Sequence, residues 1–244
     1  MVDVIRLLAA NPNGLTGSEI HRALSLPKST VFLLLRHMEE RGIAAVRPSD
    51  GKFFVGPTLV QIAHQVSGGH TIVRVARPYL EALASQTTED VYLAIRSGMH
   101  LIYVDKVSGT RSVGFDVRLG WPRSLHSTAA GKLFLSFGPP DLLEQVISEI
   151  GLPAMTKATI TDPAQLRREL KHIRVAGHAV SDGQNVEGVC GLAAPVVDYT
   201  GEVVAAVHIS ILKSRAQNDR GSLTKDMLVA ARRISAALGS GVAS

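Results

Sequence analysis

The sequence predicts an α+β fold in two domains, a small one at the N-terminus followed by a larger one. Its 244 residues exceed the usual length of a single domain and allow two hydrophobic cores. Three short helical patterns and a hairpin signal come first, and strand-like alternation with separate helical stretches begins after Thr87. We therefore expect a helical domain with a hairpin over residues 1–58, linker helices over 59–86 and a sheet domain over 87–244.

The composition is that of an ordinary globular protein, with 45% hydrophobic and 19% charged residues. No apolar run approaches the ~20 residues that cross a bilayer, and the N-terminus lacks the regions of a secretion signal, so we expect a cytoplasmic protein with no membrane partner. The single cysteine, Cys190, excludes an intramolecular disulfide and a multi-cysteine zinc site. The net charge of +5 favours an anionic partner, but the basic residues are spread over the whole chain, so charge alone identifies no partner.

Signals for helix ends divide the first domain into three helices and a hairpin. Asn-Pro-Asn-Gly at 11–14 ends a helix over 2–9, and the polar side chain of Thr16 suits the start of a second. Pro27 fits the first turn of a third helix, which Gly42 closes. Strands over 43–47 and 52–55 flank Asp-Gly, a strong hairpin signal. This order is typical of a winged helix-turn-helix, although the same geometry also serves protein interfaces.

The third helix has two faces of different chemistry. On a helical wheel the side expected to be buried carries Val31, Leu34, Leu35 and Met38. The opposite side presents groups suited to phosphates and base edges in a major groove. The residues expected to contact double-stranded DNA are Thr16, Lys28, Ser29, Thr30, Phe32, Leu33, Arg36, His37, Arg47 and Lys52.

The rest of the chain alternates between helix and strand periods. In the linker we expect a helix over 57–65, a break at 67–69 and a helix over 71–85. In the sheet domain we expect strands over 91–95, 101–107 and 112–117, helices over 128–137, 141–150 and 163–176, strands over 189–197 and 203–211, and a helix over 223–238.

Three segments of the first domain closely resemble the isocitrate-lyase-regulator (IclR) family: Leu-Ser-Leu-Pro-Lys-Ser-Thr-Val at 24–31, Leu-Leu-Arg-His-Met-Glu-Glu-Arg-Gly at 34–42 and Asp-Gly-Lys-Phe-Phe-Val-Gly at 50–56. In the larger domain, residues 120–132, 177–182 and 188–196 resemble the family's effector-binding domain. The resemblance covers essentially the whole chain. It implies a winged helix-turn-helix followed by a GAF-like effector domain, a palindromic operator, a small-molecule effector, no cofactor, and a homo-oligomer that is a dimer or a dimer of dimers.

One position on the recognition helix departs from the family pattern. Members usually carry arginine where this chain has Leu33. Leucine cannot bind guanine through two hydrogen bonds but can pack on a thymine methyl group, so we expect an altered operator preference in which Arg36 makes more of the polar contact.

The resemblance also implies a ligand pocket lined by Gly120, Asp182, Cys190, Gly191, His208 and Ser210. From their chemistry we add Trp121, Leu125, His126 and Ser127 to the expected ligand-binding residues. Relatives often have two serines at positions 208 and 210, whose spacing of two puts both side chains on one face of a strand. A histidine at 208 can be cationic, which favours an acidic or hydroxylated ligand, with Phe115, Trp121 and Leu125 as an apolar wall.

The segment His126-Ser127-Thr128 precedes a predicted helix and offers groups that bind a carboxylate at a helix N-terminus. The structural alternative is plain N-capping by Ser127 and Thr128 and a structural hydrogen bond from His126.

Other function classes have little support. Gly131-Lys132 lacks the leading glycine of a phosphate loop, no Gly-x-Ser-x-Gly elbow occurs, and Cys190 has the apolar flanks of a buried cysteine, so we expect no catalysis. His126, His178, His208 and Asp182 lack the spacing of a metal motif, and we expect no metal. The main alternative is a ligand sensor or scaffold whose helix-turn-helix no longer binds DNA, which Leu33 favours.

Overall fold

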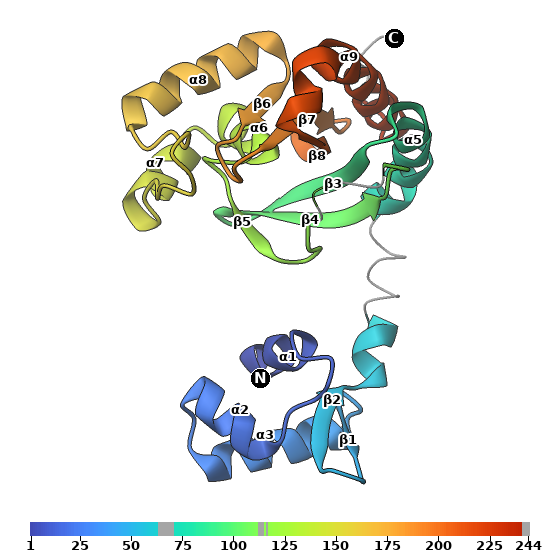
Figure 1. The fold of residues 1–244 in the computed structure, drawn as a ribbon, viewed down its shortest axis with the longest axis vertical. Coiled ribbons are helices and arrows are strands. Elements are labelled where there is room, and N and C mark those ends of the chain that lie inside the picture. Colours follow the sequence, from blue (N-terminus) through green and yellow to red (C-terminus); the bar gives the residue numbers. More distant parts are fainter. Residues whose placement is uncertain (63–70, 112–114, 116, 241–244) are drawn as a thin grey trace. The chain divides into compact units, whose positions relative to one another are not determined.

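The computed structural model describes residues 1–62, 71–111, 115 and 117–240, and the chain forms two compact units, Met1–His70 and Thr71–Ser244 (Figure 1). The first unit is helical with a hairpin and the second is a sheet covered by helices, so the predicted α+β class is confirmed. Within the described ranges, every helix is too short or too polar to span a bilayer.

The first unit has the three helices and the hairpin that the sequence predicts. A capping box at Thr16 starts the second helix, and Gly42, with a φ of 64°, turns the chain from the third helix towards the hairpin. Residues 57–62 are helical, and the rest of the helix expected over 57–65 lies outside the described residues. The elements are α1 (Val2–Ala9), α2 (Gly17–Leu24), α3 (Lys28–Glu40), β1 (Ala44–Arg47) and β2 (Lys52–Val55).

The apolar side of α3 closes the core of this unit. Val31, Leu35 and Met38 are fully buried, in a cluster with residues of α1 and α2. Leu34, predicted on the same side, is half-buried at the edge of that cluster. Because each such side chain contributes about 1.5–3 kcal/mol when buried, this face determines how α3 is oriented and therefore which side chains it exposes.

A six-stranded antiparallel sheet forms the centre of the second unit, with strand order β5-β4-β3-β8-β7-β6. In its register, Tyr92 pairs with His208, and Gly191 pairs with Ser210. Side chains on the central strands therefore meet although they lie far apart in the sequence. The strands are β3 (Asp90–Ser97), β4 (His100–Val107), β5 (Pro122–Ser124), β6 (Ala179–Asp182), β7 (Val189–Val197) and β8 (Val203–Leu212).

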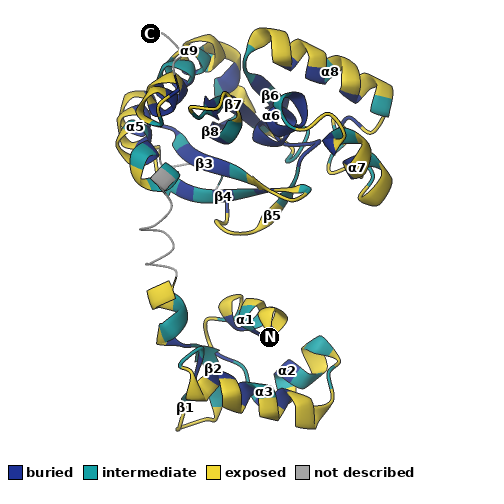
Figure 2. Ribbon diagram, turned by 180° about the vertical axis from the view of Figure 1, so that it is seen from behind, coloured by how far each residue is buried: buried dark blue, intermediate teal, exposed yellow. Residues whose placement is uncertain are grey.

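Helices cover both faces of this sheet, so the unit has three layers (Figures 1 and 2). Along β8, Val207 and Ile209 belong to the core under α5 and α9, whereas Ala206 belongs to the core under α6. This alternation is the ordinary period of a strand and decides which residues face the pocket described below. The helices are α5 (Thr71–Thr87), α6 (Ala129–Phe137), α7 (Leu142–Glu149), α8 (Pro163–Ala176) and α9 (Lys213–Ala237).

The last helix, α9, begins at Lys213, whereas the sequence predicts a start at Leu223. The added turns are polar and contain Gly221, so no apolar stripe marks them as helical. An ion pair contributes to their position, because the Arg215 guanidinium donates to both carboxylate oxygens of the buried Glu89, at 2.8 and 2.7 Å. A tertiary contact outweighs weak local propensity here.

Two short strands, β5 and β6, were not predicted, because each has only three or four residues and β5 contains a proline. The strand expected over 112–117 lies largely outside the described residues, and Phe115 and Val117, which are described, are not in a strand. The predicted linker helix α5 belongs to the second unit, where Ala76, Leu80 and Leu83 enter the core.

Candidate nucleic-acid interface and ligand pocket

Much of helix α3 is exposed (Figure 2). Its exposed residues are basic, polar and large apolar ones. Leu33 and Phe32 are 60% and 46% exposed, which is high for apolar residues of their size. Exposed apolar side chains can pack against thymine methyl groups in the major groove. The other predicted DNA-contacting residues on the helix are also exposed: Lys28, Ser29, Thr30, Arg36 and His37.

Two of these side chains share one carboxylate. Arg36 Nε lies 3.3 Å from Glu40 Oε1, and His37 Nδ1 lies 3.4 Å from Glu40 Oε2. All three side chains are at least half exposed, so water screens these contacts and they contribute little to stability. Arg36 and His37 can therefore exchange Glu40 for a DNA phosphate at low cost.

Thr16 and Phe32 are tied to the N-terminus of α2. Thr16 Oγ1 donates to the Glu19 carboxylate at 2.8 Å and accepts from the Glu19 backbone N–H at 3.3 Å. The structure therefore engages the Thr16 hydroxyl, predicted to contact DNA, in a capping box. The Phe32 ring lies over Gly17, where a Cβ atom would come within 2.9 Å of it, so α2 and α3 pack closely.

The hairpin presents its two predicted DNA contacts differently. Arg47 donates to Asp50 across the turn at 2.7 Å, and its guanidinium lies 4.6 Å from the centre of the Phe54 ring. The bond from Arg47 lowers the pKa of the Asp50 carboxyl. Lys52, by contrast, is half-buried. The ion pair between Arg47 and Asp50 stabilises the turn, and the Arg47 side chain remains exposed.

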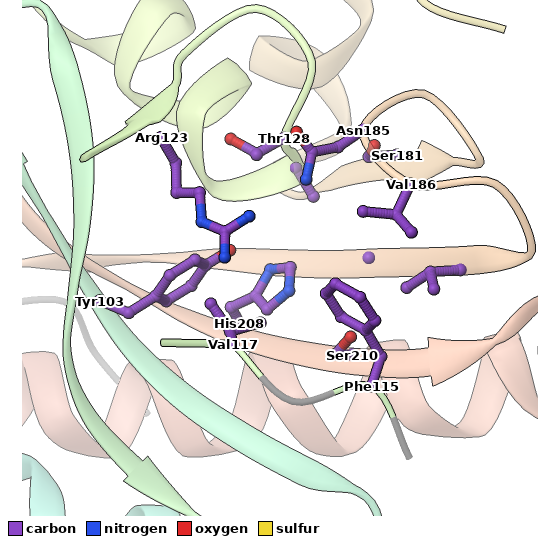
Figure 3. A pocket seen from close by; sticks show the side chains of 13 residues that line it. Tyr103, Phe115, Val117, Arg123, Thr128, Ser181, Asn185, Val186, His208 and Ser210 are labelled. Atoms are coloured by element: carbon purple, nitrogen blue, oxygen red, sulfur yellow. The ribbon is translucent and has the colours of Figure 1, made fainter. Parts of the chain in front are cut away.

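A pocket opens on the α6 side of the sheet in the second unit (Figure 3). The space between its lining residues is about 390 Å³, a volume that includes the open mouth. Its polar lining residues are Arg123, Thr128, Ser181, Asn185, His208 and Ser210. The remaining lining residues are Tyr103, Phe115, Val117, Ala129, Val186, Val189 and Gly191.

His208 is a buried polar group of the pocket. It is 5% exposed, and its ring centre lies 5.2 Å from that of Tyr103 and 5.9 Å from that of Tyr92. This burial lowers the pKa of His208 to about 3, so the ring is neutral near pH 7. A cationic His208, which the sequence allowed, is therefore disfavoured, because burial removes the hydration of its charged form.

Gly191 makes room for this histidine. A Cβ atom on Gly191 would lie 2.8 Å from His208 Cε1 and 3.5 Å from Nε2. The family resemblance implied both as pocket residues, and the sheet places the two against each other. The spacing of two between His208 and Ser210 puts both in the pocket, as expected.

Arg123, which the sequence did not indicate as a site residue, supplies the charge of the pocket. It lies on β5, and its side chain points into the pocket beside Tyr103 (Figure 3). Tyr103, on β4, is also a lining residue that was not predicted. The sequence did contain a signal, because Arg123 lies within the Gly120–Lys132 motif, but the strand β5 that directs its side chain was not predicted.

Three residues of the predicted carboxylate-binding segment have structural roles. His126 contacts Ser124 Oγ at 2.6 Å through Nδ1 and the Pro153 carbonyl oxygen at 3.0 Å through Nε2. Burial lowers the pKa of His126. Thr128 accepts from the Gly131 N–H at 3.1 Å as the N-cap of α6, while also lining the pocket. The structural alternative weighed for His126 and Thr128 matches these contacts.

Ser127 and Asn185 connect the start of α6 to the loop after β6. Ser127 Oγ donates to Asn185 Oδ1 at 3.0 Å, and the Ser127 carbonyl accepts from Ser181 Oγ at 2.6 Å. Lys132, which is fully buried, donates to Gln184 Oε1 at 2.9 Å and to Glu169 Oε1 at 2.8 Å. These bonds position the loop that brings Asn185 to the pocket.

Cys190 and Asp182 lie outside the pocket lining. Cys190 is buried on the opposite face of β7 from Gly191, because neighbouring residues of a strand point to opposite sides. Burial raises the pKa of the Cys190 thiol to about 11. Asp182 lies 3.0 Å from Lys213 Nζ at the start of α9.

The remaining predicted pocket residues also lie outside its lining. Leu125 is buried in the core under α6, and Trp121 is 49% exposed, with the Arg118 guanidinium 5.7 Å from its ring. Gly120 has a φ of 76° and donates its N–H to the Tyr103 carbonyl. Of the predicted apolar wall, Phe115 lines the pocket. No described residues gather three or more His, Cys, Asp or Glu side chains into a metal site.

Comparison with known proteins gives matches along nearly the whole chain. Residues 1–48 match the model of the IclR helix-turn-helix domain, and residues 64–236 match that of the bacterial transcriptional regulator IclR C-terminal domain. The DNA-binding transcriptional repressor YiaJ of Escherichia coli is 30% identical over 240 residues, covering 97% of this chain and 85% of the relative. The repressor AllR of Klebsiella pneumoniae is 30% identical over 98% of this chain and 88% of its own.

Solved structures of related proteins also match this chain over nearly its whole length. The crystal structure of the Thermotoga maritima IclR matches with a TM-score of 0.81 at 29% identity, covering 98% of this chain and 96% of that one. An IclR homologue from Microbacterium hydrocarbonoxydans, complexed with 4-hydroxybenzoate, matches with a TM-score of 0.84 at 27% identity, covering 93% and 92%. With both domain models matched and the recognition helix exposed, the chain belongs to the IclR family of DNA-binding transcriptional regulators.

Proposed function

We propose that this regulator binds a palindromic operator as a homo-oligomer in the cytoplasm and that a small organic acid in the pocket of the second unit changes its affinity for DNA. The observation that carries the effector proposal is Arg123, which lines the pocket and has no hydrogen-bond or ionic partner among the described residues. A homologue of the same fold is complexed with an organic acid, 4-hydroxybenzoate, which supports the same ligand class here.

The exposed face of α3 supports the DNA-binding part of the proposal. One recognition helix reads only a short half-site, and two copies related by a two-fold axis read two half-sites about one helical turn apart. The predicted contacts on α3 are exposed, and the ion pairs of Arg36 and His37 are weak enough to open. We propose that Leu33 packs on a thymine methyl group while Arg36 makes the polar base contact.

The pocket binds and releases its ligand without chemistry in this proposal. Cys190, the one thiol, lies on the far face of β7, and burial keeps it protonated because its pKa is about 11. His208 lies beside two tyrosine rings and Ser210, and none of the described lining residues is a carboxylate that could orient it as a base.

Fluorescence anisotropy on the intergenic DNA upstream of this gene tests the proposal, at two salt concentrations and with a panel of small organic acids. We expect saturable binding that weakens with salt, exceeds binding to random duplex of equal length, and changes when an acid is added. Equal affinity for both duplexes at both salt concentrations would instead favour a ligand sensor that no longer binds DNA. Selective binding that no acid alters would reject the effector.

A further inference from the structure

Among the described residues, Arg123 has no anionic partner, unlike the arginines of the second unit that form ion pairs. Arg77, Arg167 and Arg215 each hold a carboxylate oxygen at 2.7 Å. Within the described part of the chain, the Arg123 guanidinium makes no hydrogen bond or ion pair, although its side chain points into the pocket (Figure 3). A guanidinium donates two parallel hydrogen bonds to a carboxylate, so this group is arranged to bind one from the ligand.

His208 and Ser210 provide a second polar region of a different kind. His208 Nδ1 is buried without a hydrogen-bond partner among the described residues. Ser210 is 3% exposed, and its hydroxyl makes no hydrogen bond within that part of the chain. A neutral imidazole has one donor and one acceptor, and a hydroxyl has both, so together they suit a hydroxyl group and not a second negative charge.

The walls beside these polar groups are apolar. Phe115, Val186 and Val189 are apolar lining residues of the pocket. In Figure 3, Phe115 and Val186 lie on the opposite side of His208 from Arg123. Of the described lining residues, Arg123 is the one that carries a charge near pH 7. A ligand with two carboxylates would therefore leave one of them without a counter-charge from the described lining residues.

We infer that the pocket selects a compact hydroxylated monocarboxylic acid, with the carboxylate bound by Arg123 and the hydroxyl group by His208 and Ser210. This inference rests on the proposed function, because it names the ligand class of the proposed effector site. It adds what that proposal leaves open, namely a single carboxylate, a separate hydroxyl group and the side chains that distinguish them.

Calorimetric titration of the purified full-length chain with matched ligands tests the selectivity. One set is 4-hydroxybenzoate, benzoate, 4-hydroxybenzamide and terephthalate, and the other is 3-hydroxybutyrate and butyrate. In at least one set we expect the hydroxy acid to bind about tenfold more tightly than the acid without the hydroxyl group. We expect 4-hydroxybenzamide to bind about 30-fold more weakly than 4-hydroxybenzoate, because it lacks the charge. Tighter binding of terephthalate, or no hydroxyl effect in either set, would overturn the inference.

Substitutions assign the two interactions. We expect Arg123→Gln to weaken binding of the hydroxy acid about 30-fold while leaving that of the neutral amide unchanged, with Arg123→Lys in between. Arg118→Gln is the matched control, because Arg118 is exposed and lies outside the pocket lining. We expect His208→Phe to reduce binding of the hydroxy acid to the level of the acid without the hydroxyl group. Thermal melting of each variant checks that it is folded.

The outcomes separate this inference from the proposed function. If hydroxy acids bind and alter DNA affinity but Arg123→Gln binds them equally well, the inference fails and the effector site stands. If the acids bind with the expected selectivity but never alter DNA affinity, the regulatory proposal fails and the ligand class stands. If none of the acids binds, both fail.

Discussion

The contact between Gly191 and His208 predicts an energetic coupling that a double-mutant cycle can measure. In Gly191→Ala, the new methyl group lies 2.8 Å from His208 Cε1, closer than real Cβ contacts allow. Gly191 is not among the glycines with a positive φ, so alanine is compatible with its backbone and the effect reports the contact. Removing the ring in His208→Ser, the residue that relatives often have there, also removes the clash.

The magnitude follows from opposing contributions. Overpacking of a well-packed site costs about 1–3 kcal/mol, whereas alanine in a strand is favoured over glycine by about 0.5–1 kcal/mol. We expect Gly191→Ala to destabilise the wild-type protein by about 1 kcal/mol and to stabilise His208→Ser by about 0.5–1 kcal/mol. The coupling energy between the two substitutions is therefore about 2 kcal/mol.

Urea unfolding of the four proteins measures this coupling. The single tryptophan, Trp121, lies in the second unit, so its fluorescence reports the unfolding of the unit that contains the pair. Gly221→Ala is the matched control, because its Cβ would meet nothing within 4 Å, and it should show no coupling to His208→Ser. A coupling below about 0.5 kcal/mol for Gly191→Ala would show that the ring moves away freely, refuting the reasoning.

Three further predictions concern charge and recognition. Because folding keeps His208 neutral down to a pKa of about 3 while the unfolded chain takes up a proton below pH ~6.5, stability falls as the pH drops. Between pH 7 and pH 5, the wild type should lose about 2 kcal/mol more unfolding free energy than His208→Ser, measured in urea. Leu33→Arg should move the preferred operator base from thymine to guanine, at about 1–3 kcal/mol, measured by selection from random duplexes. Glu169→Gln should lower the unfolding free energy by about 2 kcal/mol, because the buried Lys132 ammonium loses its ionic partner.

Each of these has an outcome that contradicts it. Equal acid sensitivity of the wild type and His208→Ser would mean that the ring is protonated in the folded state. An unchanged base preference in Leu33→Arg would mean that this position does not face the bases. For Glu169→Gln, unchanged stability would mean that the Val180 carbonyl and Gln184 alone hold Lys132.

Local sequence patterns were sufficient to predict the helices and the hairpin of the first unit. The helix ends at Thr16 and Gly42 and the buried side of α3 followed from capping chemistry and helical period, because a short helix packs its one apolar stripe on the nearest core. The strand period likewise put His208 and Ser210 on one face. Such features depend on residues near each other in sequence, so they can be read without the fold.

Contacts between distant segments decided the rest. Arg123 and Tyr103 reach the pocket because β5 pairs with β4, and His208 is neutral because the sheet packs it between two tyrosine rings. The sequence by itself determined the family, the two kinds of domain and the exposed recognition face. Only the tertiary structure decided which side chain carries the charge in the pocket, because burial and ionisation depend on neighbours that sequence spacing does not specify.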